Sequence, residues 1–470
     1  MSEQRSVKKY RRKVTPIERL FTRSPFSTVA MVVRIRGDVS ESMLNNAVSK
    51  VRQRHPNLRA RITEDADGDP WFTSEGAKGI PIEIMPRESD THWIKVVREA
   101  GKTPYEFDVR PAIRFLLVRS PATSELIIAC HHIICDGLSL AYLARDLMIH
   151  LGDPAQPVEA LPDPAPIDRD TIPEDVSLNG VVRFLISRMN KKWERDRILF
   201  DQEDYRDLLE AYWMHYSHQM LPVELSEVQT SGLVDRCRTE GVTVNSALTA
   251  AFLGAQVLVQ GNRPHHASIG VAASLRDRLR DPAGQVMGFY AGVAQLQYKY
   301  DRKDGFWDNA RRLHDKMRPL FNNKILFKDP LMWCYLDPTI LEAINFKKLG
   351  GLVPKHSPRY QKLSAFSTRQ DVVLSVLKRD KMESLDRIAM GTAVTNLTRL
   401  DFPRHYGTLE LDRLLMKPGG AFPLANVNLV LGAVTCSGKL SLVIEYAEEA
   451  VDTATMERIK DQAMEFLLNE

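Results

Sequence analysis

The stretch Glu125-Leu126-Ile127-Ile128-Ala129-Cys130-His131-His132-Ile133-Ile134-Cys135-Asp136-Gly137 is the part of the sequence from which the fold can be worked out. Its apolar run predicts a buried strand, and the Asp-Gly pair at its end is typical of a turn. Beyond the turn, apolar side chains recur at helical spacing, at Leu138, Leu140, Leu143, Ala144 and Leu147. The local unit is therefore predicted to be strand, turn and helix, with two histidines where the strand leaves the core.

The residues alone leave three interpretations of this histidine pair open: a catalytic base, a structural pair, or part of a metal site. A zinc site, or a metal-dependent hydrolase using both histidines and the aspartate, needs further ligands at suitable spacing. The sequence contains no Cys-x-x-Cys and no His-Glu-x-x-His, so we expect no metal. A second pair, His265-His266, follows Gly261-Asn262-Arg263-Pro264 and lacks an Asp-Gly, so we interpret it as a loop without a catalytic role.

The pattern His131-His132-x-x-x-Asp136-Gly137 resembles a signature shared by a large superfamily of acyl-transferring proteins. Its members include nonribosomal peptide condensation domains, polyketide-associated acyltransferases, wax ester synthases, plant hydroxycinnamoyl-type acyltransferases and chloramphenicol acetyltransferase. Further segments resemble the same superfamily in the same order: residues 15–19, 54–59, 271–276, 284–290, 394–397 with 406–407, and 438–442 with Tyr446. Leu275 and Gln285 depart from the usual pattern, because they replace a glycine and an asparagine. The resemblance covers nearly the whole chain.

The resemblance implies an α+β fold of two chloramphenicol-acetyltransferase-like lobes, each a mixed sheet with packed helices, with a substrate tunnel between them. It implies direct attack on a thioester in a ternary complex, with His132 as the general base; an imidazole with a pKa near 6.5 suits that role. Asp136 is implied to be structural and to pair with an arginine of the second lobe. That partner is Arg276, or Arg278 as second choice.

Other site residues are expected around this centre. Gly137 lets the backbone turn closely against the substrate channel, where a larger side chain would add a Cβ, and His131 has a supporting role. Four further residues are expected to line the second half of the channel, or to contact substrate and help hold the oxyanion: Gly288, Tyr290, Thr395 and Asn396. Cys130 and Cys135 flank the histidines, and we expect them to be small buried side chains rather than nucleophiles.

Length, charge and cysteine content limit the class of protein. A chain of 470 residues suggests two domains of roughly 150 to 250 residues each. A net charge of +4 gives no argument for nucleic acid, and the basic cluster at residues 8–13 is interpreted as a solvated or disordered tail, with docking of an acidic partner as the alternative. No apolar run of 18 residues and no apolar signal core occur, so we expect no membrane span and a cytoplasmic protein. Five cysteines, an odd number, fit reduced thiols.

The chain divides at a proline-rich segment. We expect an N-terminal lobe at 1–152 with the histidine motif, a connector at 153–176 that carries six prolines, and a C-terminal lobe at 177–470. Helical character is expected at 178–216, 225–237, 243–252 with Asn245 or Ser246 as its cap, and 452–468. Strands are expected at 267–273, 291–298, 388–394, 429–435 and 440–446, and the last two should form a hairpin.

Three functions are considered. The first is an acyltransferase that esterifies or amidates a small-molecule acceptor. The second is a condensation enzyme that works in trans on carrier-bound aminoacyl groups. The third is a non-catalytic binding or docking relative, and the intact His132, Asp136 and Gly137 argue against it. No cofactor is expected to be bound permanently. Leu349-Gly350-Gly351-Leu352 resembles the start of a carrier-domain motif, but Val353 stands where that motif needs its attachment serine. The donor is therefore expected to be a separate co-substrate, either acyl-CoA or the phosphopantetheinyl thioester of an acyl carrier protein.

Overall fold

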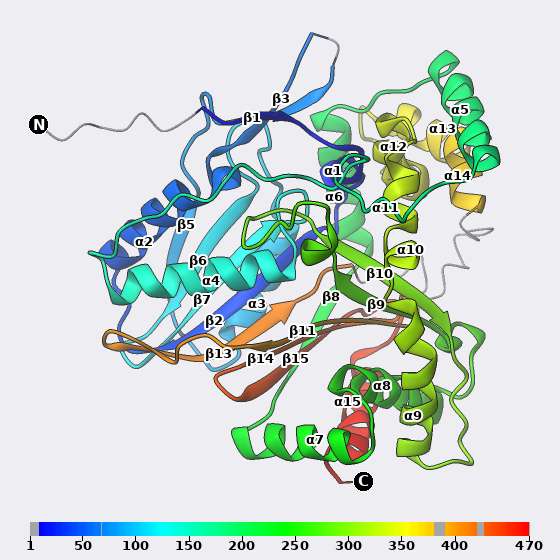
Figure 1. Ribbon diagram of the computed structural model, residues 1–470. Helices are drawn as coiled ribbons and strands as arrows, with labels where there is room; N and C mark the ends of the chain where they lie inside the picture. The colour runs from blue at the N-terminus through cyan, green and yellow to red at the C-terminus, as the bar shows by residue number, and fades with distance from the viewer. Residues whose placement is uncertain (1–8, 67, 380–390, 421–426, 470) are drawn as a thin grey trace, which may run out of the picture.

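Two six-stranded sheets form the centre of the computed structural model, which describes residues 9–66, 68–379, 391–420 and 427–469 (Figure 1). The strands of the first sheet, in spatial order, are β12 (His405–Tyr406), β13 (Leu409–Lys417), β2 (Thr28–Arg36), β7 (Thr123–His131), β6 (Ile113–Arg119) and β5 (Ile82–Pro86). Only β5 and β6 run parallel, and the other pairs are antiparallel. The sheet is therefore mixed.

The second sheet is also mixed. Its strands, in spatial order, are β10 (Ala291–Gln297), β9 (Ser268–Ser274), β11 (Thr392–Leu400), β14 (Leu429–Cys436), β15 (Lys439–Ala447) and β8 (His218–Glu224). Strand β11 is parallel to both of its neighbours, and β14 and β15 form the antiparallel hairpin that the sequence predicts. A small third sheet contains β1 (Arg11–Lys13), β4 (Pro70–Thr73) and β3 (Arg61–Glu64). The predicted α+β fold with two mixed-sheet lobes is confirmed.

The two sheets are joined by a strand from the far end of the chain. Strand β13 pairs with β2 of the first sheet, so that Lys417 lies opposite Ala30, before the chain returns to the second sheet in β14. Residues 153–179 contain no helix and no strand. The domain boundary at 153–176 stays a prediction, but the first sheet is not built from the first 152 residues alone.

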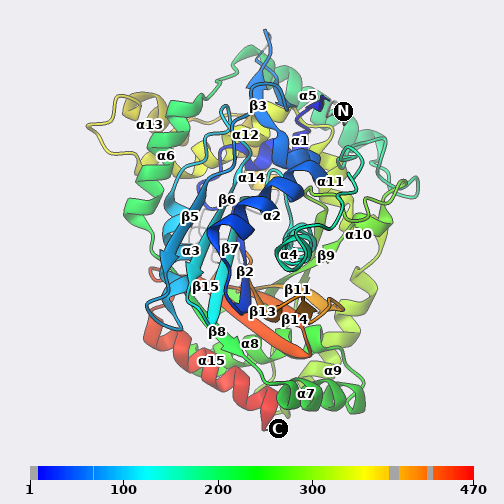
Figure 2. The same ribbon diagram turned by 90° about the vertical axis from the view of Figure 1, so that its left-hand side faces the viewer.

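Helices cover both sheets (Figures 1 and 2). The α-helices are α1 (Pro16–Thr22), α2 (Glu41–Arg54), α3 (His92–Lys102), α4 (Gly137–Gly152), α5 (Gly180–Arg195), α6 (Gln202–His215), α7 (Glu227–Thr239), α8 (Val244–Gln260), α9 (Phe306–Met317), α10 (Asn323–Leu326), α11 (Lys328–Trp333), α12 (Pro338–Leu349), α13 (Tyr360–Thr368), α14 (Val372–Arg379) and α15 (Thr453–Leu468). Short 3-10 helices are η1 (Pro56–Arg59), η2 (Pro264–Ala267), η3 (Arg276–Arg278), η4 (Arg318–Leu320) and η5 (Gly350–Leu352). Helices α2 and α4 pack together beside the first sheet, whereas α8 and α15 pack together beside the second.

Strand β2 shows why the first sheet is buried on both faces. Met31 and Val33 point into the large core that contains α2 and α4, whereas Ala30 and Val32 pack with α3 and with Val443 of the second sheet. Successive side chains of a strand point to opposite faces, so a strand covered on both sides has to be apolar at nearly every position. Because β2 and β7 are antiparallel, the start of β2 at Thr28 lies beside the end of β7 at His131.

Several local predictions are corrected. The helical stretch at 178–216 is two helices, because residues 196–201 break it and Asp201 caps α6 through a capping box. Helix α8 is capped by Thr243, whose side chain accepts from the Ser246 N–H, rather than by Asn245 or Ser246. The described part of the basic N-terminal cluster forms strand β1 instead of a tail. The predicted strand at 388–394 begins at Thr392, and its residues 388–390 lie outside the described residues.

Candidate active site

The histidine motif lies where β7 leaves the sheet. The His131 N–H donates to the Ala112 carbonyl at 2.9 Å as the last pairing of the strand, and the His132 N–H donates to the Ser27 carbonyl at 2.9 Å. The chain then turns, and the Asp136 side chain accepts from the Ser139 N–H at 2.7 Å as the cap of α4. The predicted unit of strand, turn and helix is present, and a rigid sheet and a capped helix hold the turn on either side.

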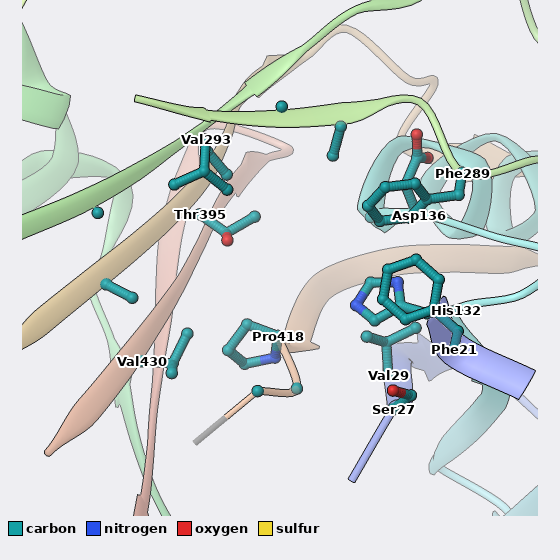
Figure 3. A pocket seen from close by; sticks show the side chains of 18 of the residues that line it. Phe21, Ser27, Val29, His132, Asp136, Phe289, Val293, Thr395, Pro418 and Val430 are labelled. Carbon is teal, nitrogen blue, oxygen red and sulfur yellow. The ribbon is translucent and has the colours of Figure 1, made fainter. Parts of the chain in front are cut away.

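His132 faces a cavity between the two sheets. Figure 3 shows His132 beside Phe21 and Phe289 on one side of this cavity, with Val293 and Thr395 on the opposite side. The Nδ1 atom of His132 is 3.1 Å from the Cys135 carbonyl oxygen, which can only accept a hydrogen bond. The hydrogen is therefore on Nδ1, and Nε2 keeps a free lone pair. Burial lowers the pKa of His132 below its ordinary value, although the bond to Cys135 opposes this, so the ring is neutral at pH 7.

His131 points into the core instead. It is 1% exposed and lies edge-on to the rings of Tyr105 and Phe107, and its Nδ1 accepts from the Ile133 N–H at 3.3 Å. Burial lowers its pKa to about 3. The ring does not line the cavity and is packed as part of the protein interior. The bond to Ile133 joins His131 to the turn that follows His132, and its supporting role stays a prediction.

Asp136 is enclosed by hydrogen-bond donors. Its Oδ1 is 2.8 Å from Arg276 Nη2 and also accepts from the Ser139 N–H, and its Oδ2 accepts from the Tyr290 N–H at 3.1 Å. Arg276 donates in addition through Nη1 to the carbonyls of Gly284 and Val286, at 3.0 and 2.8 Å. The arginine thus joins the histidine turn to the 284–290 loop of the other half of the chain. Asp136 lines the cavity, and both of its carboxylate oxygens accept hydrogen bonds from the protein itself.

The second-choice arginine makes different contacts. Arg278 donates through Nη1 to Asn323 Oδ1 at 3.1 Å and through Nη2 to the Phe321 carbonyl at 3.2 Å. Its guanidinium is therefore bound to the segment around α10. Of the two arginines that the sequence offered as partners of Asp136, Arg276 is the one that the structure brings to the carboxylate.

Gly137 lies at the start of α4, where the chain passes close to two side chains. A Cβ at this position would come within 2.8 Å of Leu397 Cδ2 and 2.9 Å of Met416 Sδ. Distances this short require the neighbouring side chains to move. Gly137 also lines the cavity, so the absence of a side chain keeps space next to His132.

The loop that follows Arg276 contributes to the site through a residue the sequence did not single out. Gly288 bonds to Ser139 through its carbonyl and its N–H, and Tyr290 is 1% exposed with its hydroxyl donating to the Ala165 carbonyl at 3.0 Å. Phe289, between them, lines the cavity, with its ring centroid 5.4 Å from that of His132. Gly288 is not among the lining residues of this cavity, and Tyr290 lines only the adjoining one. Alternation along the loop was the only available signal for Phe289.

Thr395 lines the cavity of His132, whereas the neighbouring Asn396 does not. Thr395 lines the cavity that contains His132, opposite the imidazole (Figure 3). Asn396 lines the adjoining cavity, and its side-chain oxygen accepts from the Thr398 N–H at 2.8 Å within a bulge of β11. The bulge uses the oxygen of Asn396 locally, so Thr395 is the better placed of the two to meet a substrate.

The cavity that contains His132 has a volume of about 320 Å³ and adjoins one of about 450 Å³, which in turn adjoins one of about 870 Å³. The first and second share Gly137 and Thr395 among their lining residues, and the second and third share Asn245 and Arg399. The three cavities therefore follow one another from His132 toward α7, and the third is lined by residues of the second lobe, among them Glu227, Asn245 and Leu440.

A buried ionic network holds the segment at Gly419, which lines the cavity next to His132. Glu445 Oε1 lies 2.8 Å from Lys417 Nζ and 3.2 Å from His218 Nδ1, and its Oε2 accepts from the Gly419 N–H at 2.8 Å. Burial tends to raise the pKa of Glu445, but Lys417 and His218 outweigh it and hold the value at about 2. Gly419, at φ +72°, passes so close to the imidazole that a Cβ would be 3.8 Å from His132 Nε2. No pattern in the sequence indicates this network, because His218 is 227 positions from Glu445 and no motif connects them.

Cys130 and Cys135 are fully buried, and burial raises the pKa of the Cys135 thiol well above its ordinary value. A thiol in that state is a poor nucleophile at neutral pH.

The second histidine pair lies in η2, where His265 Nε2 is 2.8 Å from Asn428 Nδ2. Within the described ranges, no group of three or more His, Cys, Asp or Glu side chains is arranged to hold a metal ion.

None of the helices in the described part of the chain has by itself the length and apolar composition that a membrane span needs. Helices α7 and α8 reach that length and composition only when taken together, and they meet at an angle of 96°.

Two family profiles match the sequence. Residues 11–152 match the condensation domain, and residues 217–322 match the C-terminus of phthiocerol/phthiodiolone dimycocerosyl transferase. Among curated proteins, the chain is 24% identical over 323 residues to a linear gramicidin synthase of Brevibacillus parabrevis, and 29% identical over 159 residues to the nonribosomal peptide synthetase agiA of Aspergillus flavus. These alignments cover 66% and 32% of this chain but only 6% and 2% of those proteins.

Solved structures share the whole fold. Polyketide synthase associated protein 5 from Mycobacterium tuberculosis matches with a TM-score of 0.58 at 16% identity, covering 98% of both chains. The TRI3 trichothecene 15-O-acetyltransferase from Fusarium sporotrichioides matches with a TM-score of 0.63 at 14% identity, covering 100% of this chain and 97% of that one. The first condensation domain of the CDA synthetase gives 0.60 at 14% identity, covering 98% and 97%. At these identities the structures demonstrate a shared fold.

Proposed function

The chain belongs to the condensation-domain and CoA-dependent acyltransferase superfamily, and from this premise we propose that it moves an acyl group from a thioester donor to a hydroxyl or amine acceptor. The observation that carries the proposal is the state of His132: its Nδ1 is bound to the Cys135 carbonyl and its ring faces the cavity. A neutral imidazole held in this tautomer is a suitable general base. The catalytic residue is therefore His132, positioned by the turn that Asp136, Gly137 and Arg276 stabilise.

The reaction proceeds by direct attack. The acceptor oxygen or nitrogen bonds to the thioester carbonyl carbon while Nε2 of His132 takes the acceptor proton. The tetrahedral intermediate then collapses, the carbon–sulfur bond breaks, and the thiolate receives the proton from the imidazolium to leave as a thiol. No acyl-enzyme is required. Thr395, whose side chain lies across the cavity from the imidazole, is the candidate for contact with the reacting carbonyl.

The reaction needs a donor as well as an acceptor. The donor is acyl-CoA or an acyl group on a phosphopantetheinyl carrier protein, and both carry the acyl group on a long flexible arm. The similarity to nonribosomal peptide synthetases supports the carrier-bound donor, whereas the similarity to an O-acetyltransferase structure supports the other. A condensation reaction on a carrier-bound aminoacyl group is thus the second candidate, with the same chemistry at His132.

The experiment is a turnover measurement by mass spectrometry on the wild type, His132→Ala and a control, His356→Ala, which changes an exposed histidine. Acetyl-CoA, longer acyl-CoA esters and acyl-carrier proteins are supplied as donors, each with a mixture of alcohols and amines. Product that forms with the wild type and with His356→Ala, but is lost with His132→Ala, supports the proposal, and the preferred donor separates the two candidates. Turnover that survives in His132→Ala at the wild-type rate refutes the assignment of the base.

A further inference from the structure

The cavity that contains His132 has an unusual charge composition. Its lining side chains are mostly apolar or aromatic, and the only ionisable ones among the described residues are His132, Asp136 and Asp329. No lysine or arginine is among those lining residues. Asp136 is already neutralised by Arg276. Asp329 is therefore the one carboxylate of the described cavity wall whose charge is not compensated there.

Asp329 lies on α11, which closes one side of the cavity. Its side chain is partly buried, and none of the hydrogen bonds or ion pairs among the described residues involves its carboxylate. Burial raises the pKa of Asp329, which neighbouring Lys328 only partly offsets. A carboxylate in apolar surroundings is costly unless a donor or a positive charge accompanies it. A positive charge on a molecule that enters this cavity would supply such a partner.

An aromatic ring accompanies the carboxylate. Trp333 follows Asp329 by four residues on the same short helix, so the two lie on the same helix face, and both line the cavity. A carboxylate next to an indole is a combination that binds ammonium groups, through a charge-assisted hydrogen bond and a cation–π contact. Neither group is suited to binding the phosphates of a donor.

We infer that Asp329, with Trp333, selects an acceptor that carries a protonated amine at its non-reacting end, such as an amino alcohol or a diamine. The inference rests on the proposed function, because it assigns this cavity to the acceptor. The attacking oxygen or nitrogen must be neutral and must lie at His132, so the cationic amine is a separate group held at the α11 side. Asp329 is then a specificity residue and takes no part in proton transfer.

Binding without a donor tests the inference directly. Dissociation constants of hexylamine and of hexan-1-ol are measured by isothermal titration calorimetry for the wild type, Asp329→Asn and the control Asp315→Asn, which changes an exposed aspartate. We expect the amine to bind the wild type and the control roughly 10- to 100-fold more tightly than the alcohol, and this preference to disappear in Asp329→Asn. Equal binding of the two probes to the wild type, or a preference that survives in Asp329→Asn, overturns the inference.

A second measurement separates this inference from the proposed function. Acylation of 6-aminohexan-1-ol and of hexan-1-ol is compared for the wild type and Asp329→Asn. A rise in KM of tenfold or more for the amino alcohol alone, with kcat retained, supports the specificity role. Turnover of both acceptors with equal KM in both proteins overturns it while leaving the transferase intact. If no acceptor is turned over but calorimetry shows an amine preference that depends on Asp329, the proposed function is contradicted and the ammonium site is supported.

Discussion

Removal of the Asp136 carboxylate should destabilise the fold as well as the activity. Asp136 and Arg276 are 7% and 2% exposed, so Asp136→Ala leaves a buried guanidinium without its counter-ion, a change that costs about 3 to 5 kcal/mol. Arg276 keeps its bonds to two backbone carbonyls, which favours the lower end of that range. The same substitution removes the cap of α4, worth about 1 kcal/mol. We therefore expect the free energy of unfolding to fall by about 4 kcal/mol.

Arg276→Met should cost less. It leaves Asp136 with the N–H groups of Ser139 and Tyr290, and we expect a loss of about 3 kcal/mol. Because both substitutions break the same pair, the double variant should lose clearly less than the roughly 7 kcal/mol that the two single losses would add up to. Arg278→Ala is the matched control, since its bonds to the α10 segment are partly exposed, and it should cost less than about 1 kcal/mol.

Urea unfolding at pH 7, followed by tryptophan fluorescence, measures these free energies, and turnover is measured in parallel. If Asp136→Ala unfolds at the wild-type urea concentration but has lost turnover, the carboxylate acts in the chemistry and the structural assignment is refuted. Additive losses in the double variant would refute the direct pairing with Arg276, even if each single variant is destabilised.

Three further predictions concern the histidines and the glycine of the motif. Because burial lowers the pKa of His132, the acid limb of the profile of kcat/KM against pH should have an apparent pKa below the ordinary histidine value of about 6.5. An apparent pKa at or above that value would contradict a neutral, buried base. His131 has a pKa of about 3 in the folded protein, so the unfolded state binds more protons as pH falls below about 6.5, and stability is lost toward acid. Between pH 7 and pH 4 the wild type should lose about 3 kcal/mol more than His131→Asn in urea titrations, and equal losses would refute this. Gly137→Ala should destabilise the fold by about 1 to 3 kcal/mol and reduce turnover, since its Cβ meets two side chains. The control Gly180→Ala, whose Cβ meets nothing within 4 Å, should stay within about 1 kcal/mol of wild type in thermal melts. Equal effects of the two substitutions would show that the neighbours of Gly137 yield freely.

Much of the candidate site could be predicted because it is local in sequence. The histidines, Asp136 and Gly137 occupy seven consecutive positions between an apolar run and a helical repeat, and those patterns indicate a strand end, a turn and a helix start without any knowledge of the rest of the chain. Arg276 was found through resemblance of its segment, since nothing in the residues themselves points to a partner 140 positions away.

Side-chain direction in the second half was predicted less well. Of the four residues expected in the channel, Thr395 lines the cavity of His132, Tyr290 and Asn396 line the adjoining cavity, and Gly288 lines neither. Phe289, which was not among the four, lines the cavity of His132. Thr395 and Asn396 are neighbours in the regularly paired part of β11, and the bulge begins only after Asn396. Their side chains therefore point to opposite faces of the sheet, and only the packing of the two lobes decides which face meets the cavity of His132.

The sequence by itself determined the mixed α+β character of the chain and the turn that carries the histidines, because short-range periodicity and a contiguous motif specify local structure. Only the tertiary structure decided that β13 crosses to the first sheet, that Glu445 supports the wall at Gly419, and that Asp329 lies in the cavity of His132. These arrangements depend on which distant segments pack together. The free energy that selects them comes from burial and ion pairing summed over both lobes, and no local pattern records that sum.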